Sequence, residues 1–283
     1  MFPMPIDKAS APVRGLYKAA LPVSLLIWLA PIIAVALTSI RGQADLTQGN
    51  YWGIPTQWQM AQNYAAVFRN TPIVHYIANS FLVTIPTVIG AVGLSCLAGF
   101  ALGIYRFKMN LVVFFIFVGG NFVPFQILMV PVRDLSLRLG LYDTVTGLVL
   151  FHVAFQTGFC TFFMRNFIRD LPSELIDASR VEGATEFQIF WKVVLPLVRP
   201  AVAALAVLIF TFIWNDYFWA TVLIQGDHAM PVTGGLKTLN GQWVAQWQLV
   251  SAGSIVAAMP PVIIFFLMQK HFIAGLTMGA TKG

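Results

Sequence analysis

The feature that most constrains this chain is a series of six long segments with almost no charged residues. A bilayer core about 30 Å thick is crossed by roughly 20 helical residues, because each residue advances an α-helix by about 1.5 Å. Each segment is long enough to cross, and none alternates polar with apolar residues as a membrane strand would. The segments are Ala19 to Ile40, one within Asn70 to Tyr105, one within Met109 to Val132, Thr144 to Met164, Pro200 to about Ile224, and one inside Thr238 to Gln269.

Composition agrees with a membrane protein. Only 10% of the 283 residues are charged and 58% are hydrophobic, whereas soluble domains carry about 25% charged residues. We therefore predict an all-α integral membrane protein with six transmembrane helices. We interpret the first segment as a retained helix, because it is longer than a signal-peptide core and contains Pro22 and Pro31.

The distribution of lysine and arginine predicts the orientation. Six helices place both termini on one side of the membrane, and cytoplasmic loops carry an excess of these residues. One side holds twelve of the 17, namely Lys8, Arg14, Lys18, Arg106, Lys108, Arg165, Arg169, Arg180, Lys192, Arg199, Lys270 and Lys282. We expect a bacterial-type cytoplasmic membrane protein with cytoplasmic termini. Its domains would be a cytoplasmic N-terminal segment at 1–18, a membrane domain at 19–272 and a cytoplasmic tail at 273–283. The excess of lysine and arginine on one side accounts for the net charge of +6, so the charge does not indicate nucleic-acid binding.

The motifs of common enzymes are missing from the sequence. It contains no G-x-x-x-x-G-K-[ST] phosphate loop and no H-E-x-x-H pair, and its four histidines are scattered. Cys96 and Cys160 both fall within apolar segments, where a buried thiol behaves as a small hydrophobe. We expect no catalytic residue, no bound cofactor and no metal site in this chain.

One loop between the fourth and fifth segments is unusually polar and long, running over residues 165–199. Pro172 is suited to the start of a helix, and Gly183 to its end, since glycine accepts the left-handed conformation that closes helices. Thr185 and Gln188 have the spacing of a capping box, which predicts a second helix that ends before Pro196. Simple connections are much shorter, so the loop is predicted to be a docking element.

The same loop carries a resemblance to a known family. The run Asp177-Ala178-Ser179, three residues, Gly183, nine residues, Val193, one residue, Leu195-Pro196 resembles the E-A-A-x3-G-x9-I-x-L-P motif. That motif belongs to the permease subunits of ATP-binding-cassette (ABC) importers. Further segments, "NFVPFQILMVPVRDLSLRLGLYDT", "FIWNDYFWATVL" and the ending "MQKHFIAGLTMGATKG", are similar to carbohydrate-importer permeases of the maltose-transporter type, the ending to the second permease.

The resemblance implies a set of partners and a role for the loop. The partners would be a second, homologous permease in a heterodimer, two cytoplasmic ATPase subunits that use ATP and Mg²⁺, an extracytoplasmic solute-binding protein and the lipid bilayer. The loop would be the coupling helix, which sits in a cleft of the ATPase. The coupling residues implied are Glu174, Asp177, Ala178, Ser179, Glu182, Gly183, Leu195 and Pro196.

A few polar residues within the apolar segments are candidates for the solute path. Asp216 is an acid in the fifth segment, and an ionised carboxylate in a bilayer should face protein or a wet cavity. It either lines a gate or, with Asn215, forms a helix-packing contact. His152 and Gln156 share a face of the fourth segment, and Gln126 lies in the third. These three either bind sugar or hydrogen-bond between helices.

The segment from Arg41 to Thr71 lies on the outer side in this scheme and is rich in aromatic and amide residues. It either contacts the binding protein or lies as an amphipathic belt at the membrane surface.

The function predicted from the sequence is half of the path of an ATP-driven sugar importer. The alternatives are an ABC importer permease for a non-sugar solute and an ion-coupled secondary transporter. The second alternative requires ionisable groups in several segments, and the sequence offers one acid.

Overall fold

The computed structural model describes residues 10–239 and 246–278, with side chains up to residue 269. Within those ranges the chain is helical, and its one bridge between extended segments joins Arg41 to Trp58. The chain divides into two compact units, residues 1–71 with 238–256 and residues 72–237 with 257–283. Helix α14, Trp247–Met278, contributes to both.

Four helices are long and apolar enough to cross a membrane. They are α1 (Ala11–Ser39), α4 (Ile73–Ile104), α7 (Val145–Arg169) and α14, and they match the first, second, fourth and sixth predicted segments. Two bent helix pairs raise the number of possible spans to six. The all-α fold is confirmed, and the six predicted spans are reached when each bent pair counts as one span.

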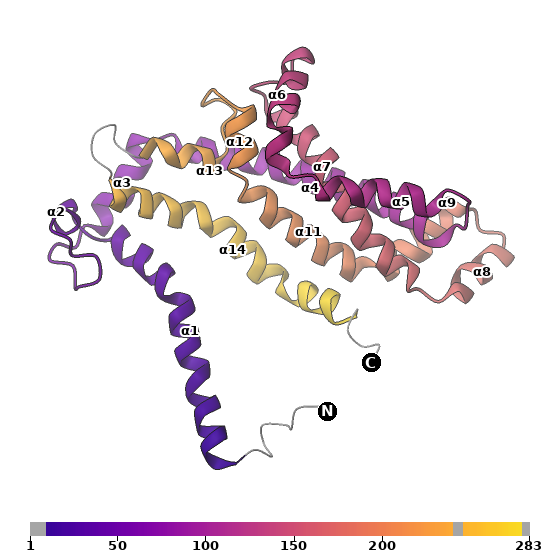
Figure 1. The fold of residues 1–283 in the computed structure, drawn as a ribbon, viewed down its shortest axis with the longest axis horizontal. Helices are drawn as coiled ribbons and strands as arrows, with labels where there is room; N and C mark the ends of the chain where they lie inside the picture. The colour runs from indigo at the N-terminus through magenta and orange to yellow at the C-terminus, as the bar shows by residue number, and fades with distance from the viewer. Residues whose placement is uncertain (1–9, 240–245, 279–283) are drawn as a thin grey trace. The chain divides into compact units, whose positions relative to one another are not determined.

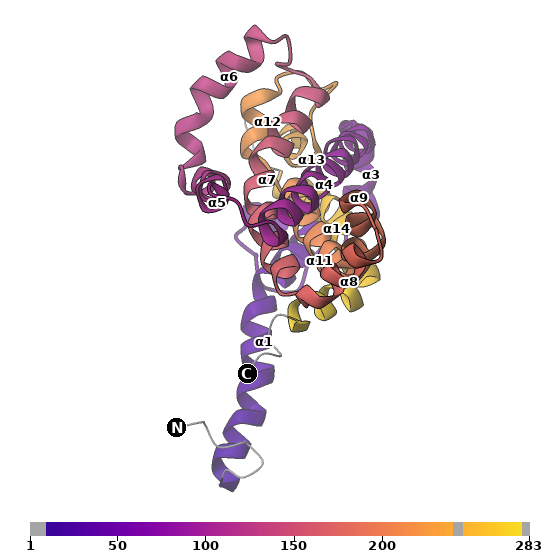
Figure 2. The ribbon, with the colours of Figure 1, turned by 90° about the vertical axis from the view of Figure 1, so that its right-hand side faces the viewer.

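The third segment is broken near its middle. Helix α5, Asn110–Gly119, continues through a short 3-10 turn, Gly120–Phe122, and a second 3-10 turn, Phe125–Leu128, leads into α6, Met129–Arg138. The two halves meet at 89° (Figure 2). Pro124 explains the break, because proline donates no hydrogen bond and disfavours helical geometry in Val123, which is extended.

The core of the second unit is the close pair α4 and α7, with α11 (Arg199–Trp214) packed against both (Figure 1). Glycines on α4 permit this approach. A Cβ on Gly99 would lie 3.0 Å from the backbone nitrogen of Arg165, and one on Gly103 would lie 3.3 Å from the Ile168 side chain. Small residues at such contacts are typical of helix pairs within membranes.

One end of the second unit is fastened by hydrogen bonds between α4 and the segment around α13, Val232–Gly235. Asn79 donates to the carbonyls of His228 and Met230 at 3.0 and 3.1 Å, and the Ser80 hydroxyl accepts from Val232 N at 2.8 Å. Helix α12, Phe218–Leu223, precedes this segment. Residues far apart in sequence thus form a rigid cap.

The first unit has a polar centre at Arg41, which is fully buried. Its guanidinium donates to the carbonyl of Asn50 at 2.7 Å and to that of Gly53. Asn63, on α3 (Met60–Asn70), donates to the Arg41 carbonyl at 2.8 Å. The bonds fold the segment that follows α1, including the short helix α2 (Gln43–Thr47), into a compact structure.

Candidate functional site

The polar loop folds as two helices joined at Gly183. Helix α8, Ser173–Val181, starts directly after Pro172, and α9 covers Glu186–Ile189. Gly183 has φ +83°, so the left-handed conformation expected from the sequence is confirmed. Ala184 N donates to Ser179 O at 3.0 Å and Gly183 N to Arg180 O at 3.0 Å. These are the two bonds of a Schellman motif, which closes the helix and fixes the direction of the chain after it.

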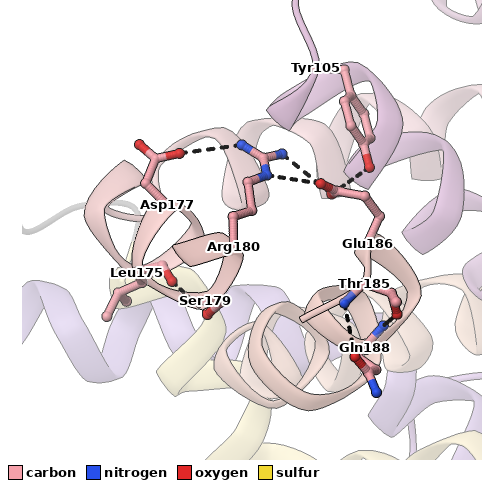
Figure 3. Close-up of polar contacts among 8 residues, drawn as sticks. All are labelled: Tyr105, Leu175, Asp177, Ser179, Arg180, Thr185, Glu186 and Gln188. Atoms are coloured by element: carbon pink, nitrogen blue, oxygen red, sulfur yellow. Dashed lines mark hydrogen bonds and ion pairs between the residues drawn. The ribbon is translucent and has the colours of Figure 1, made fainter. Parts of the chain in front are cut away.

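The capping box expected at the start of the second helix is also present (Figure 3). The Thr185 hydroxyl accepts from Gln188 N at 3.3 Å, and the Gln188 side chain accepts from Thr185 N at 2.8 Å. The bonds satisfy backbone donors that α9 would otherwise leave unpaired. The two helices are therefore held by backbone and capping bonds on both sides of the glycine.

Arg180 links α8 to α9 across the turn at residues 182–185, which we call the corner (Figure 3). Its guanidinium donates to Glu186 Oε1 at 2.9 Å and to Asp177 Oδ1 at 3.3 Å, and the Tyr105 hydroxyl donates to Glu186 Oε2 at 2.6 Å. The hydrogen bonds from Arg180, followed by that from Tyr105, lower the pKa of the Glu186 carboxyl. Burial and the bond to Glu186 raise the pKa of Tyr105 to about 12. The corner is thereby tied to the end of α4.

The remaining residues that the resemblance implies for coupling lie at or near the surface of this unit. Glu174, Glu182, Ala178 and Gly183 are exposed, and a Cβ on Gly183 would meet nothing within 4 Å. The half-buried ones are Ser179, which bonds to Leu175 O at 2.7 Å, Leu195 and Pro196.

Large apolar side chains next to the corner are exposed as well. Val181 is 88% exposed and Phe187 is 71% exposed. Ile176 and Ile189 of the same two helices are buried and anchor the loop to the rest of the unit. The loop thus presents a preformed surface of mixed polarity.

The expected helix end before Pro196 is wrong. A π-helical turn spans Phe190–Val194, and α10, Leu195–Leu197, follows it with Pro196 inside. Leu195 N donates to Phe190 O, five residues back. A π turn shifts the hydrogen-bond ladder by one residue, so the missing N–H of the proline costs less than in a regular helix. The helix then bends by 74° into α11.

Asp216 lies in the break between α11 and α12, outside regular helix. Its carboxylate accepts from Trp219 N at 3.2 Å and Ala220 N at 2.9 Å, so it caps the start of α12. Its Oδ2 atom, which accepts the bond from Ala220 N, lies 3.5 Å from Nε2 of His152, whose side chain is 3% exposed. This Nε2 has no hydrogen-bond partner of its own in the described chain. Oδ2 and Nε2 are thus close enough for an ion pair but do not have the geometry of a hydrogen bond.

The other three residues suggested for the path do not join this pair by any hydrogen bond in the described chain. Asn215 is exposed and donates back to Thr211 O on its own helix at 2.8 Å. Gln156 is half-buried one turn beyond His152 on α7, and Gln126 is exposed in the 3-10 turn that follows Pro124.

Sequence reasoning missed two members of the corner, Glu186 and Tyr105. The opposite charges of Arg180 and Glu186, one on each side of Gly183, are a sequence signal that could have identified Glu186. No sequence signal places Tyr105 beside them. Among the described residues there is no cluster that could hold a metal ion, and Cys96 and Cys160 are buried and unpaired.

Comparison with known proteins gives a consistent picture. Residues 9–278 match the model of the family described as "Binding-protein-dependent transport system inner membrane component". A probable ABC transporter permease protein of Pyrococcus horikoshii is 33% identical, over 88% of this chain and 91% of the relative. The arabinooligosaccharides transport system permease protein AraQ of Halalkalibacterium halodurans is 32% identical, over 89% and 91%.

A solved structure shares the fold over nearly the whole chain. It is the crystal structure of a bacterial ABC transporter involved in the import of the acidic polysaccharide alginate. The match has a TM-score of 0.79 and 26% identity, and covers 96% of this chain and 100% of the matched chain. These relatives are membrane components and not enzymes. The chain therefore belongs to the binding-protein-dependent transport system inner membrane components, the membrane-embedded permease subunits of ABC importers.

Proposed function

We propose that the solute is a sugar or sugar derivative and that the chain forms half of its translocation path. Two similar proteins, a permease for arabinooligosaccharides and a transporter that imports alginate, support a carbohydrate. The resemblance of the "FIWNDYFWATVL" segment to carbohydrate-importer permeases agrees with this assignment. His152 on α7 and Asp216 in the break between α11 and α12 lie 3.5 Å apart, and we assign them to a gate in the path.

The observation that carries the proposed coupling role is the exposed corner at Gly183. Its two helices are fixed by their own hydrogen bonds, yet the apolar side chains of Val181 and Phe187 beside it are exposed. A rigid element with uncovered apolar side chains is suited to insertion into a partner. We propose that an ATPase subunit receives it and contacts Glu174, Asp177, Ala178, Ser179 and Glu182 on α8 and its cap. Leu195 and Pro196 on α10 would complete the same coupling element.

The proposed assembly contains a second, homologous permease, two ATP-binding-cassette ATPases and an extracytoplasmic solute-binding protein. ATP and Mg²⁺ bind to the ATPases, and this chain binds no cofactor. The segment after α1 offers a surface for the binding protein, since Trp52 is 68% exposed and Ile54 83% exposed on a fold stabilised from within by Arg41. Thr56 fixes that fold further, because its hydroxyl and backbone N–H bind Asp45 and lower the pKa of that carboxyl.

Uptake by the reconstituted complex tests the solute class. The chain with its copurifying subunits and binding protein should accumulate a radiolabelled neutral or acidic oligosaccharide in ATP-loaded proteoliposomes. Amino acids and peptides, supplied with the same binding protein, serve as controls. Uptake confined to an amino acid or a peptide would replace the sugar proposal by the non-sugar importer. Uptake driven by an ion gradient without ATP would contradict both.

The proposed orientation puts both termini and the loop of α8 and α9 in the cytoplasm. Reporter fusions after Lys108 and Phe190 should therefore be active only as cytoplasmic reporters, and fusions after Gly49 and Gly235 only as external ones. The reason is the excess of lysine and arginine on the first side. An external reporter signal at Phe190 would contradict this orientation.

A further inference from the structure

A polar pocket of about 1040 Å³ lies where α4 and α7 end, beside the loop that joins α4 to α5 and beside α8. All of its walls come from the second unit. The contacts around Gly183 described above use one edge of it, at Tyr105, Asp177 and Arg180. The other residues of the pocket wall take no part in those contacts.

The charge of the walls is strongly one-sided. Five cationic side chains line the pocket and one acid does, namely Arg106, Lys108, Arg165, Arg169, Arg180 and Asp177. Arg180 is already neutralised by Asp177 and Glu186. Arg106, Lys108 and Arg165 form no ion pair within the described chain. The pocket is therefore an electropositive cavity that an anion would stabilise.

Arg165 is a built component of this cavity. Its side chain is only 7% exposed, although it has no carboxylate partner. Its Nε donates to Leu102 O at 3.1 Å, and its guanidinium lies 4.1 Å from the centre of the Phe114 ring. These contacts fix the guanidinium plane, while its two Nη nitrogens hydrogen-bond to nothing in the described chain. Such a fork is suited to paired phosphate oxygens.

The position of the pocket favours an amphiphilic ligand. It lies at the ends of two membrane-spanning helices, which is the level of lipid headgroups. Leu111, in the pocket wall on α5, is 59% exposed, and Phe115 one turn further along α5 is 64% exposed. A molecule with an anionic head and a hydrocarbon tail would satisfy the cations and the apolar surface of α5 together.

We propose that this pocket binds the phosphate headgroup of an anionic phospholipid, with Arg165 as the buried anchor and Arg106 and Lys108 at the mouth. An acidic segment of a partner protein would explain the cations but not the apolar surface that continues from them along α5. Inorganic phosphate has the same head chemistry without the tail. Because α8 forms one wall, a bound lipid would contact the element that we assign to coupling.

The test compares lipid binding by charge-neutralised variants of the assembled complex. Arg106→Gln with Lys108→Gln removes two exposed cations and leaves the buried Arg165 in place. Lys192→Gln with Arg199→Gln removes two exposed cations on the same side that do not line the pocket. Binding of fluorescent phosphatidylglycerol is measured in a neutral detergent, with fluorescent phosphatidylcholine as the zwitterionic comparison and inorganic phosphate as competitor.

We expect the first variant to bind phosphatidylglycerol roughly thirtyfold more weakly than wild type, because each of the two cations near an anionic headgroup contributes about 1 kcal/mol. The second variant should bind like wild type, and phosphatidylcholine should bind weakly to all. Equal phosphatidylglycerol binding by the first variant and wild type would overturn the proposal. Displacement of phosphatidylglycerol by millimolar inorganic phosphate would contradict a lipid ligand and would indicate a site for free anions. Loss of ATPase content without loss of lipid binding would assign the cations to protein docking instead.

Discussion

Replacement of Gly183 by aspartate should leave the membrane helices inserted and reduce the ATPase that copurifies with the complex by tenfold or more. Nothing in the chain lies within 4 Å of the added Cβ, so the new carboxylate meets the docking partner and not the rest of this subunit. Hot-spot residues, which cluster near the centre of an interface, contribute about 2 kcal/mol or more, which is about a thirtyfold change in binding. The measurements are ATPase content after purification and substrate-stimulated hydrolysis in liposomes.

Gly140 provides a matched control for this substitution. It has φ +68°, it is exposed, and a Cβ there would likewise meet nothing within 4 Å. Gly140→Asp therefore imposes the same backbone cost, about 1 kcal/mol, at a site between α6 and α7. It should retain its ATPase. Normal ATPase content and uptake in Gly183→Asp would show that the corner is not the coupling element. Equal losses in both variants would assign the effect to backbone strain.

Asp216→Asn should give a complex that assembles normally and transports at least about tenfold more slowly. The amide keeps one acceptor oxygen for the backbone of α12, but it cannot form an ion pair with His152. His152 is buried, and its Nε2 has no hydrogen-bond partner among the described residues. We interpret this arrangement as the loose form of a contact with Asp216 that becomes a close ion pair when the break between α11 and α12 moves. Loss of about 1.4 kcal/mol of stabilisation from the close form corresponds to a tenfold slower rate.

Two further variants separate gating from capping. His152→Gln removes the other partner and should reduce uptake to a similar degree, whereas Asp134→Asn, an acid-to-amide change at an exposed position of α6, should not. Initial uptake rates at equal complex content are the measurement. Near-wild-type uptake by Asp216→Asn would limit Asp216 to capping α12.

The local features of the fold could be predicted from the sequence because they depend on neighbours in the chain. The apolar segments predicted the long helices, and the Thr185–Gln188 spacing predicted the capping box that is present. The positive φ of Gly183 followed from glycine standing between two helical patterns. Each of these depends on residues within one or two helical turns.

The features that sequence reasoning missed depend on packing between distant segments or on small shifts in the hydrogen-bond ladder. Tyr105 reaches Glu186 only because the end of α4 lies beside α9, a contact across 81 residues. The π turn before Pro196 changes which carbonyl Leu195 bonds to, and no residue pattern marks it. The sequence predicts Asp216 within a span, whereas α11 ends just before it at Trp214.

The Schellman bonds at Gly183 have a consequence for how such subunits diverge. The angle between α8 and α9 is maintained by main-chain groups, by the Thr185–Gln188 cap and by Arg180, while Val181 on the outside contributes almost nothing to it. In the docking that we propose, substitutions at outward positions would therefore change which ATPase is accepted without altering the angle between α8 and α9. A gene duplicate could acquire a new motor subunit by surface changes alone, while the path through the membrane is inherited intact.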